Sequence, residues 1–159
     1  MPVLKKETMI TCLKAGLLIL PFIINFLTLK DGHNWGDDFA QYIIYAQNMI
    51  AGRYYAEGVM VGLPVVYPPF YGIVLMPFLY LFGMNFIVLK ALNLLFWGIV
   101  AGGAYVFFTW KGDRHAWRNT LLIAWSAYFF YYKQNVLSDI VFAALVMAAL
   151  LLYEAFQKK

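Results

Sequence analysis

Two adjacent carboxylates, Asp37 and Asp38, are the residues of this chain best suited to chemistry. A carboxylate beside an acceptor hydroxyl can take its proton while the hydroxyl oxygen attacks an electrophile. The same two residues stand where a helix is expected to begin, with Asp37 as its N-cap and Asp38 in its first turn. The pair therefore has two open interpretations, a general base or a helix cap without chemistry.

The segment that follows the acidic pair has the spacing of a helix with one apolar face. Tyr42 lies one helical turn after Asp38, and Gly52 is expected to end the helix. Apolar side chains recur every three or four residues along this segment, at Phe39, Tyr42, Ile43, Ala46, Met49 and Ile50. The helix therefore has a face that must be buried against another element.

Composition indicates the environment of these residues. Hydrophobic residues make up 64% of the chain, charged residues only 13%, and the mean hydropathy is +0.70. Such values are typical of an integral membrane protein. Four stretches approach the roughly 20 apolar residues that a membrane-spanning helix needs, and they are 9–29, 86–110, 120 to about 136, and 140–156. The first stretch has no small-residue cleavage site, so we expect it to remain as an anchor.

A fifth apolar segment, 68–82, is too short to span a bilayer. As a helix it would be about 22 Å long, against a hydrocarbon core of roughly 30 Å. If it stays on the outer side, eight of the twelve basic residues fall on or near the cytoplasmic side, against five if it spans. We therefore expect an all-α integral membrane protein of the cell inner membrane, with about four transmembrane helices and both termini in the cytoplasm. The first outer loop, 30–85, would carry interfacial amphipathic helices.

Two other classes of site have little support in the sequence. The basic residues that give the net charge of +4 are scattered at the ends of apolar segments, which indicates membrane topology and not nucleic-acid binding. His33 and His115 fall on opposite sides of the membrane, so no zinc site is expected. Asp31 and His33 could gather with the acidic pair around an ion, although a general base is the better use of that pair.

Five short motifs together resemble the N-terminal part of the GT-C superfamily of glycosyltransferases, and most closely its bacterial protein mannosyltransferase and aminoarabinose transferase group. The last of them contains Asp139, which is similar to the second acidic position of that group. The motifs are Gly36-Asp37-Asp38-Phe39-Ala40-Gln41-Tyr42, Gly52 with Tyr54 and Tyr55, Tyr67-Pro68-Pro69-Phe70, Leu81-Phe82-Gly83, and Leu137-Ser138-Asp139-Ile140-Val141-Phe142.

The resemblance implies a reaction and a set of roles. A sugar would move from a polyprenyl-phosphate donor to an acceptor hydroxyl on the outer face, without a cofactor or a metal ion. Asp38 would be the base, and Asp37 is the second candidate. The phosphate leaving group needs cationic partners, for which Arg53, Lys90 and Lys133 stand on the correct side. Interfacial anchoring is the alternative role of these cations. Substrate contacts are also implied for Tyr42, Tyr67 and Asp139.

The chain departs from the family in two respects. Val65, Val66 and Tyr67 stand where some relatives have an acidic-basic pair, and 159 residues are few for this superfamily. We therefore expect one transmembrane module, residues 1–159, that corresponds to the N-terminal part of a larger architecture. The remaining part is either absent or supplied by a second chain. The alternative is a non-catalytic four-span protein, either a remnant or a subunit that presents or flips a lipid-linked sugar. A transporter would have more polar residues within its spans.

Overall fold

The computed structural model describes residues 2–33, 35, 37–58 and 67–158, apart from the side chains of residues 2–5, 37 and 38. All regular secondary structure in these residues is helical, as predicted. The helices are α1 (Pro2–Leu27), α2 (Asp37–Ile50), α3 (Phe70–Phe82), α4 (Phe86–Trp110), α5 (Ala116–Ala124), α6 (Ala127–Tyr132) and α7 (Ser138–Gln157).

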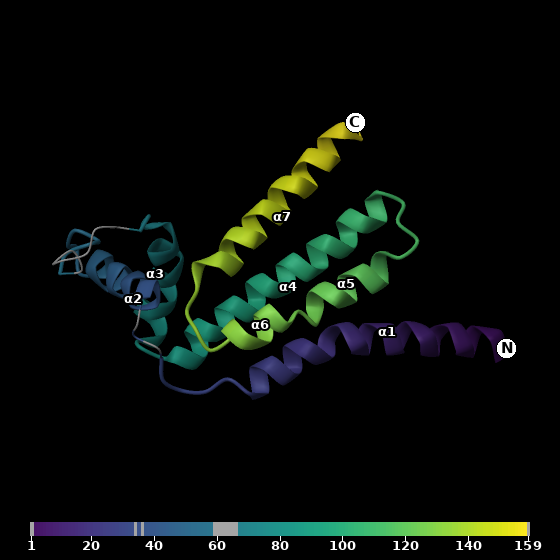
Figure 1. The fold of residues 1–159 in the computed structure, drawn as a ribbon, viewed down its shortest axis with the longest axis horizontal. Helices are drawn as coiled ribbons and strands as arrows, with labels where there is room; N and C mark the ends of the chain where they lie inside the picture. Colours follow the sequence, from purple (N-terminus) through teal and green to yellow (C-terminus); the bar gives the residue numbers. More distant parts are fainter. Residues whose placement is uncertain (1, 34, 36, 59–66, 159) are drawn as a thin grey trace.

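The long helices run roughly side by side, with α4 between α5 and α7 (Figure 1). Both ends of the chain and the α4–α5 turn lie at one end of this arrangement. Helices α2 and α3 lie at the other end, beside the start of α4.

Three helices are long and apolar enough to cross a membrane, namely Lys6–Leu27, Phe86–Trp110 and Ser138–Gln157. They correspond to three of the four predicted spans. The fourth, at 120–136, is not confirmed, because α5 ends at Ala124 and α6 begins at Ala127. Hydropathy counts apolar residues and does not register such a break. The interruption coincides with a tertiary contact, since the indole of Trp125 donates a hydrogen bond to the Leu17 carbonyl of α1 at 3.0 Å.

Helix α2 begins at Asp37 and ends at Ile50, two residues before Gly52, which was expected to end it. Gly52 has a φ of 68°, and its amide donates to the Met49 carbonyl at 3.1 Å. The next amide, that of Arg53, reaches back to the Asn48 carbonyl at 2.9 Å. Two such bonds around a left-handed glycine form a Schellman motif. The chain thus turns sharply at the end of α2.

Helix α3 packs against α2 through a close approach at Gly72. A Cβ atom at this position would lie 2.9 Å from Cε of Met49 and 3.0 Å from Cβ of Tyr45. The absence of a side chain therefore allows the two helices to meet. Their facing residues join the first turns of α4 in a buried core that includes Ile43, Tyr45, Ala46, Leu75, Leu79, Leu89 and Leu92.

Candidate functional site

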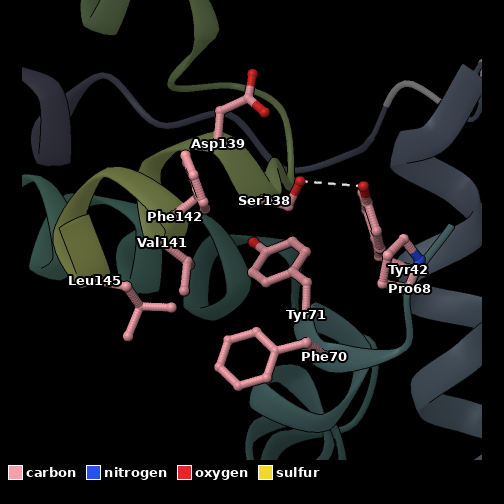
Figure 2. A pocket seen from close by; sticks show the side chains of 9 residues that line it. All are labelled: Tyr42, Pro68, Phe70, Tyr71, Ser138, Asp139, Val141, Phe142 and Leu145. Atoms are coloured by element: carbon pink, nitrogen blue, oxygen red, sulfur yellow. Dashed lines mark hydrogen bonds between the residues drawn. The ribbon is translucent and has the colours of Figure 1, made fainter.

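A cavity of about 240 Å³ lies where α2, the start of α3 and the start of α7 meet (Figure 2). It is formed by segments that are far apart in the sequence. Its lining comprises Tyr42, Pro68, Phe70, Tyr71, Ser138, Asp139, Val141, Phe142 and Leu145. Residues of three of the five motifs therefore meet around one space.

The polar rim of this cavity comes from the first turn of α7. The Ser138 hydroxyl donates a hydrogen bond to the Tyr42 hydroxyl oxygen at 3.0 Å, which links α7 to α2. The Asp139 carboxylate accepts a hydrogen bond from the Tyr128 hydroxyl at 3.0 Å. In Figure 2 this carboxylate points away from Phe70 and Tyr71. Asp139 thus lies at the mouth of the cavity, on the side nearer α6.

Below the rim, a buried hydrogen-bonded chain connects α3, α4 and the segment before α7. The Tyr71 hydroxyl donates to Oδ1 of Asn93 at 2.9 Å, and Nδ2 of Asn93 donates to the Asn135 carbonyl at 2.7 Å. Burial, helped by the neighbouring Tyr42, raises the pKa of Tyr71 above its ordinary value of 10.0. Tyr71 therefore stays protonated at neutral pH and remains a donor.

Tyr42 is the centre of a cluster of tyrosine rings. Its ring centroid lies 5.1 Å from that of Tyr71, 5.9 Å from that of Tyr67 and 6.4 Å from that of Tyr45. Such distances are typical of favourable aromatic pairs. Tyr42 and Asp139 thus line one cavity, and Tyr67 contacts Tyr42 without being among the lining residues. These are three of the six residues predicted to contact substrate.

The acidic pair is placed by its backbone alone. Asp37 and Asp38 form the first turn of α2, one turn before Tyr42, but their side chains lie outside the description. Val65 and Val66 also lie outside the described residues. The choice between a general base and a helix cap therefore stays a prediction.

Lys90, predicted to meet phosphate, has other partners. The residue is 2% exposed, and its ammonium donates to the carbonyls of Lys30 at 2.7 Å and Gly32 at 2.6 Å. A longer contact of 3.4 Å reaches Oε1 of Gln134, which also accepts from the Lys30 amide at 2.9 Å. Lys90 thus attaches the α1–α2 linker to α4, and contact with a phosphate would require the ammonium to exchange partners.

The other two predicted cations also lie outside the cavity lining. The Lys133 ammonium donates to the Thr28 hydroxyl at the end of α1. Arg53 lies beside a separate hollow of about 400 Å³, together with Gln47 and Leu79. None of the three is among the residues that line the cavity between α2, α3 and α7. Their role as phosphate ligands stays a prediction.

Sequence reasoning gave no role to several residues of the site. Ser138 is part of the fifth motif, and Tyr71 directly follows the third. Tyr128 stands in an aromatic run that is ordinary at a membrane interface. The available signal was the hydroxyl of Ser138 directly before Asp139 at a helix start. Its partner in α2 could not be inferred from spacing, because 96 positions separate it from Tyr42.

Among the described residues, no three His, Cys, Asp or Glu side chains are grouped so that they could hold a metal ion. No protein-family model matches the chain, and neither the curated proteins nor the solved structures contain a significant match to it. The likeness to the GT-C superfamily therefore rests on the motifs quoted from the sequence.

Proposed function

We propose that this chain is a module of a membrane glycosyltransferase, which transfers a sugar from a polyprenyl-phosphate donor to an acceptor hydroxyl on the outer face. One observation carries the proposal. Distant parts of the sequence contribute polar side chains to the lining of one cavity, namely those of Tyr42, Tyr71, Ser138 and Asp139. Residues of three of the five motifs that suggested the family therefore lie where a substrate could bind.

The cavity has the two kinds of surface that a lipid-linked sugar needs. At its mouth, the Tyr42 and Ser138 hydroxyls and the Asp139 carboxylate can exchange hydrogen bonds with sugar hydroxyls. Deeper along α7, Phe142 and Leu145 are 68% and 48% exposed. Leu145 lies about 9 Å along the helix axis from Asp139. The sugar would occupy the mouth, and the isoprenoid would follow α7 into the bilayer.

In the proposed reaction, Asp38 takes the proton of the acceptor hydroxyl while the hydroxyl oxygen attacks the anomeric carbon. The bond between that carbon and the phosphate oxygen breaks, and the lipid phosphate leaves with the electron pair. Inversion at the anomeric carbon follows from attack opposite to the leaving group. Arg53, Lys90 and Lys133 are the candidates to stabilise the departing phosphate.

The proposed orientation places α2, α3 and the cavity on the outer face of the inner membrane and both termini in the cytoplasm, with α5 and α6 as an interrupted fourth crossing. It is tested with single cysteines in a Cys12→Ser background. A cysteine at Glu57 should react with an impermeant reagent in intact cells, and one at Arg114 should not. Labelling at position 114 alone would reverse the orientation. Labelling at both positions would place them on the same side and exclude the single crossing by α4 that is proposed between them.

The proposed substrate is tested by mass spectrometry of lipids that copurify with the intact chain. Polyprenyl-phosphate lipids should be enriched over the membrane extract, and Leu145→Trp should remove them by filling the cavity. Leu152→Trp is the matched control, because Leu152 is exposed on the same helix and does not line the cavity. No enrichment in the unaltered protein, or equal loss in both variants, would contradict the proposal.

The second candidate is a non-catalytic subunit that presents or flips the lipid-linked sugar. It is favoured by the carbonyl partners of Lys90 and by the absence of Lys and Arg from the described lining of the cavity. A subunit of this kind would retain the lipid. It would not need Asp38 for transfer by the complete assembly.

A further inference from the structure

A second hollow, of about 560 Å³, lies at the start of α5, at the opposite end of the helices from the cavity (Figure 1). It borders the α4–α5 turn and is close to the end where both termini lie. Its lining comprises His115, Trp117, Arg118, Asn119, Leu121 and Leu122. No residue of this hollow takes part in the proposed sugar transfer.

The polar half of the hollow has an excess of positive charge. The exposed guanidinium of Arg118 contacts the His115 ring, and exposed Arg114 lies in the adjoining turn. The neighbouring carboxylate, Asp113, accepts hydrogen bonds from the His115 amide and from Nδ2 of Asn119, both at 2.7 Å. Over the described part of the chain, the ion pair at this end joins Lys111 to Glu154 and involves neither arginine.

The apolar half continues from this charge along α5. The Trp117 indole donates to the Lys14 carbonyl of α1 at 3.4 Å, and the Lys14 ammonium lies 5.6 Å from the centroid of the indole ring. Beyond it come Leu121 and Leu122, the latter 74% exposed. Cations, a tryptophan and two leucines, of which Leu122 is exposed, therefore follow one another along α5.

We propose that this hollow binds an anionic phospholipid, with the headgroup phosphate beside Arg118 and Arg114 and an acyl chain along Leu121 and Leu122. Basic pockets beside membrane helices are suited to anionic headgroups, because charge attraction adds to the burial of the acyl chain. Trp117 stands at the level where indole rings favour the boundary between headgroups and hydrocarbon. The site is independent of the proposed sugar transfer.

The test is native mass spectrometry of the purified full chain in detergent, titrated with phosphatidylglycerol or with phosphatidylcholine of the same chains. Phosphatidylglycerol should be retained preferentially. Arg118→Gln should weaken its retention about tenfold to a hundredfold, as expected for one lost ionic hydrogen bond, and Arg118→Lys should restore part of it. Lys158→Gln is the control, because it removes the same charge at the same end, where Lys158 lies over the Trp110 ring and outside the hollow.

Three results would overturn the proposal. Equal retention of both lipids would exclude headgroup selectivity, and equal losses in Arg118→Gln and Lys158→Gln would show diffuse attraction to the basic end. Displacement of the lipid by an equal concentration of inorganic phosphate would show a free-anion site.

If Arg118→Gln loses its helical circular dichroism, the variant Leu122→Asn is tested in its place. Leu122 is exposed, so this variant should fold and still weaken retention, and unchanged retention would contradict the acyl-chain contact.

Discussion

The two ends of the helical arrangement differ in what surrounds their charged residues. At the end that carries the cavity, Lys90 is 2% exposed and donates to main-chain carbonyls of the α1–α2 linker. At the opposite end, the side chain of Lys111 is 51% exposed and forms an ion pair with Glu154 at 2.6 Å. The same residue type thus holds a buried junction at one end and a peripheral contact at the other.

This contrast extends to the apolar residues. Tyr45, Leu75 and Leu89 are fully buried in the core around α2, α3 and α4. Met9 and Leu13 near the start of α1 are exposed, as are several other apolar residues farther along that helix. Packing and hydrogen bonds within the protein therefore hold the cavity end. The long helices leave apolar surface that is suited to contact with lipid tails.

The largest expected effect concerns the acidic pair at the cavity end. In the complete assembly, Asp38→Asn should lower the transfer rate about 10²-fold to 10⁴-fold, because it removes the proton acceptor and keeps most of the capping capacity. Asp37→Asn should be milder. Transfer of labelled sugar from polyprenyl phosphate measures both. If Asp37→Asn is inactive and Asp38→Asn is active, Asp37 is the base and Asp38 is not. If both variants are fully active, neither residue is the base and only the helix-cap interpretation remains.

The next effect compares the two lysines directly. Lys90→Met should accelerate amide hydrogen exchange in residues 28–33 about tenfold to a hundredfold, since hydrogen bonds from a charged group contribute about 1.5–3 kcal/mol. Lys111→Met removes one ion pair, formed by a half-exposed cation with a carboxylate that is 11% exposed. Because this variant removes one contact and Lys90→Met removes two short contacts to carbonyls, exchange in the last turn of α7 should change less. Equal acceleration of exchange by the two variants would contradict the expectation that the buried lysine contributes more to local stability than the exposed one.

The smallest expected effect is a pH dependence at the cavity end. Burial lowers the pKa of His33 from its ordinary value of 6.5. The Phe39 carbonyl, which contacts the ring, raises this pKa by less than burial lowers it, and the positive charge of Lys90 lowers it further. The imidazole of His33 therefore binds a proton more tightly in the unfolded chain than in the folded protein. The stability that depends on His33 is complete above pH 6.5 and is lost as the pH falls through the lowered pKa.

The thermal unfolding midpoint in detergent, measured between pH 7.5 and 5, should therefore fall on the acid side. His33→Phe should flatten this change, because a phenyl ring can still stack on Phe86, whose ring centroid lies 5.3 Å from that of His33. His115→Gln is the control at the opposite end and should keep the pH dependence. A dependence that follows His115 in place of His33 would contradict the assignment.

The sequence by itself determined the features that depend on local pattern. The predicted span at 86–110 coincides with α4, and that at 140–156 lies within α7. The span at 9–29 overlaps most of α1, which begins earlier, at Pro2. The end of α2 at Gly52 was also predictable. Hydropathy and a left-handed glycine act within one helix, so neighbouring residues are sufficient to predict them.

Only the tertiary structure decided which residues meet. The break between α5 and α6 coincides with the contact between Trp125 and α1, and the cavity exists because Tyr42 and Ser138 come together across 96 positions. The family resemblance and the predicted topology made Lys90 a candidate phosphate ligand, yet in the fold its ammonium donates to carbonyl oxygens of a distant linker. Contacts of this kind depend on the paths of whole helices. No local window of residues contains that information.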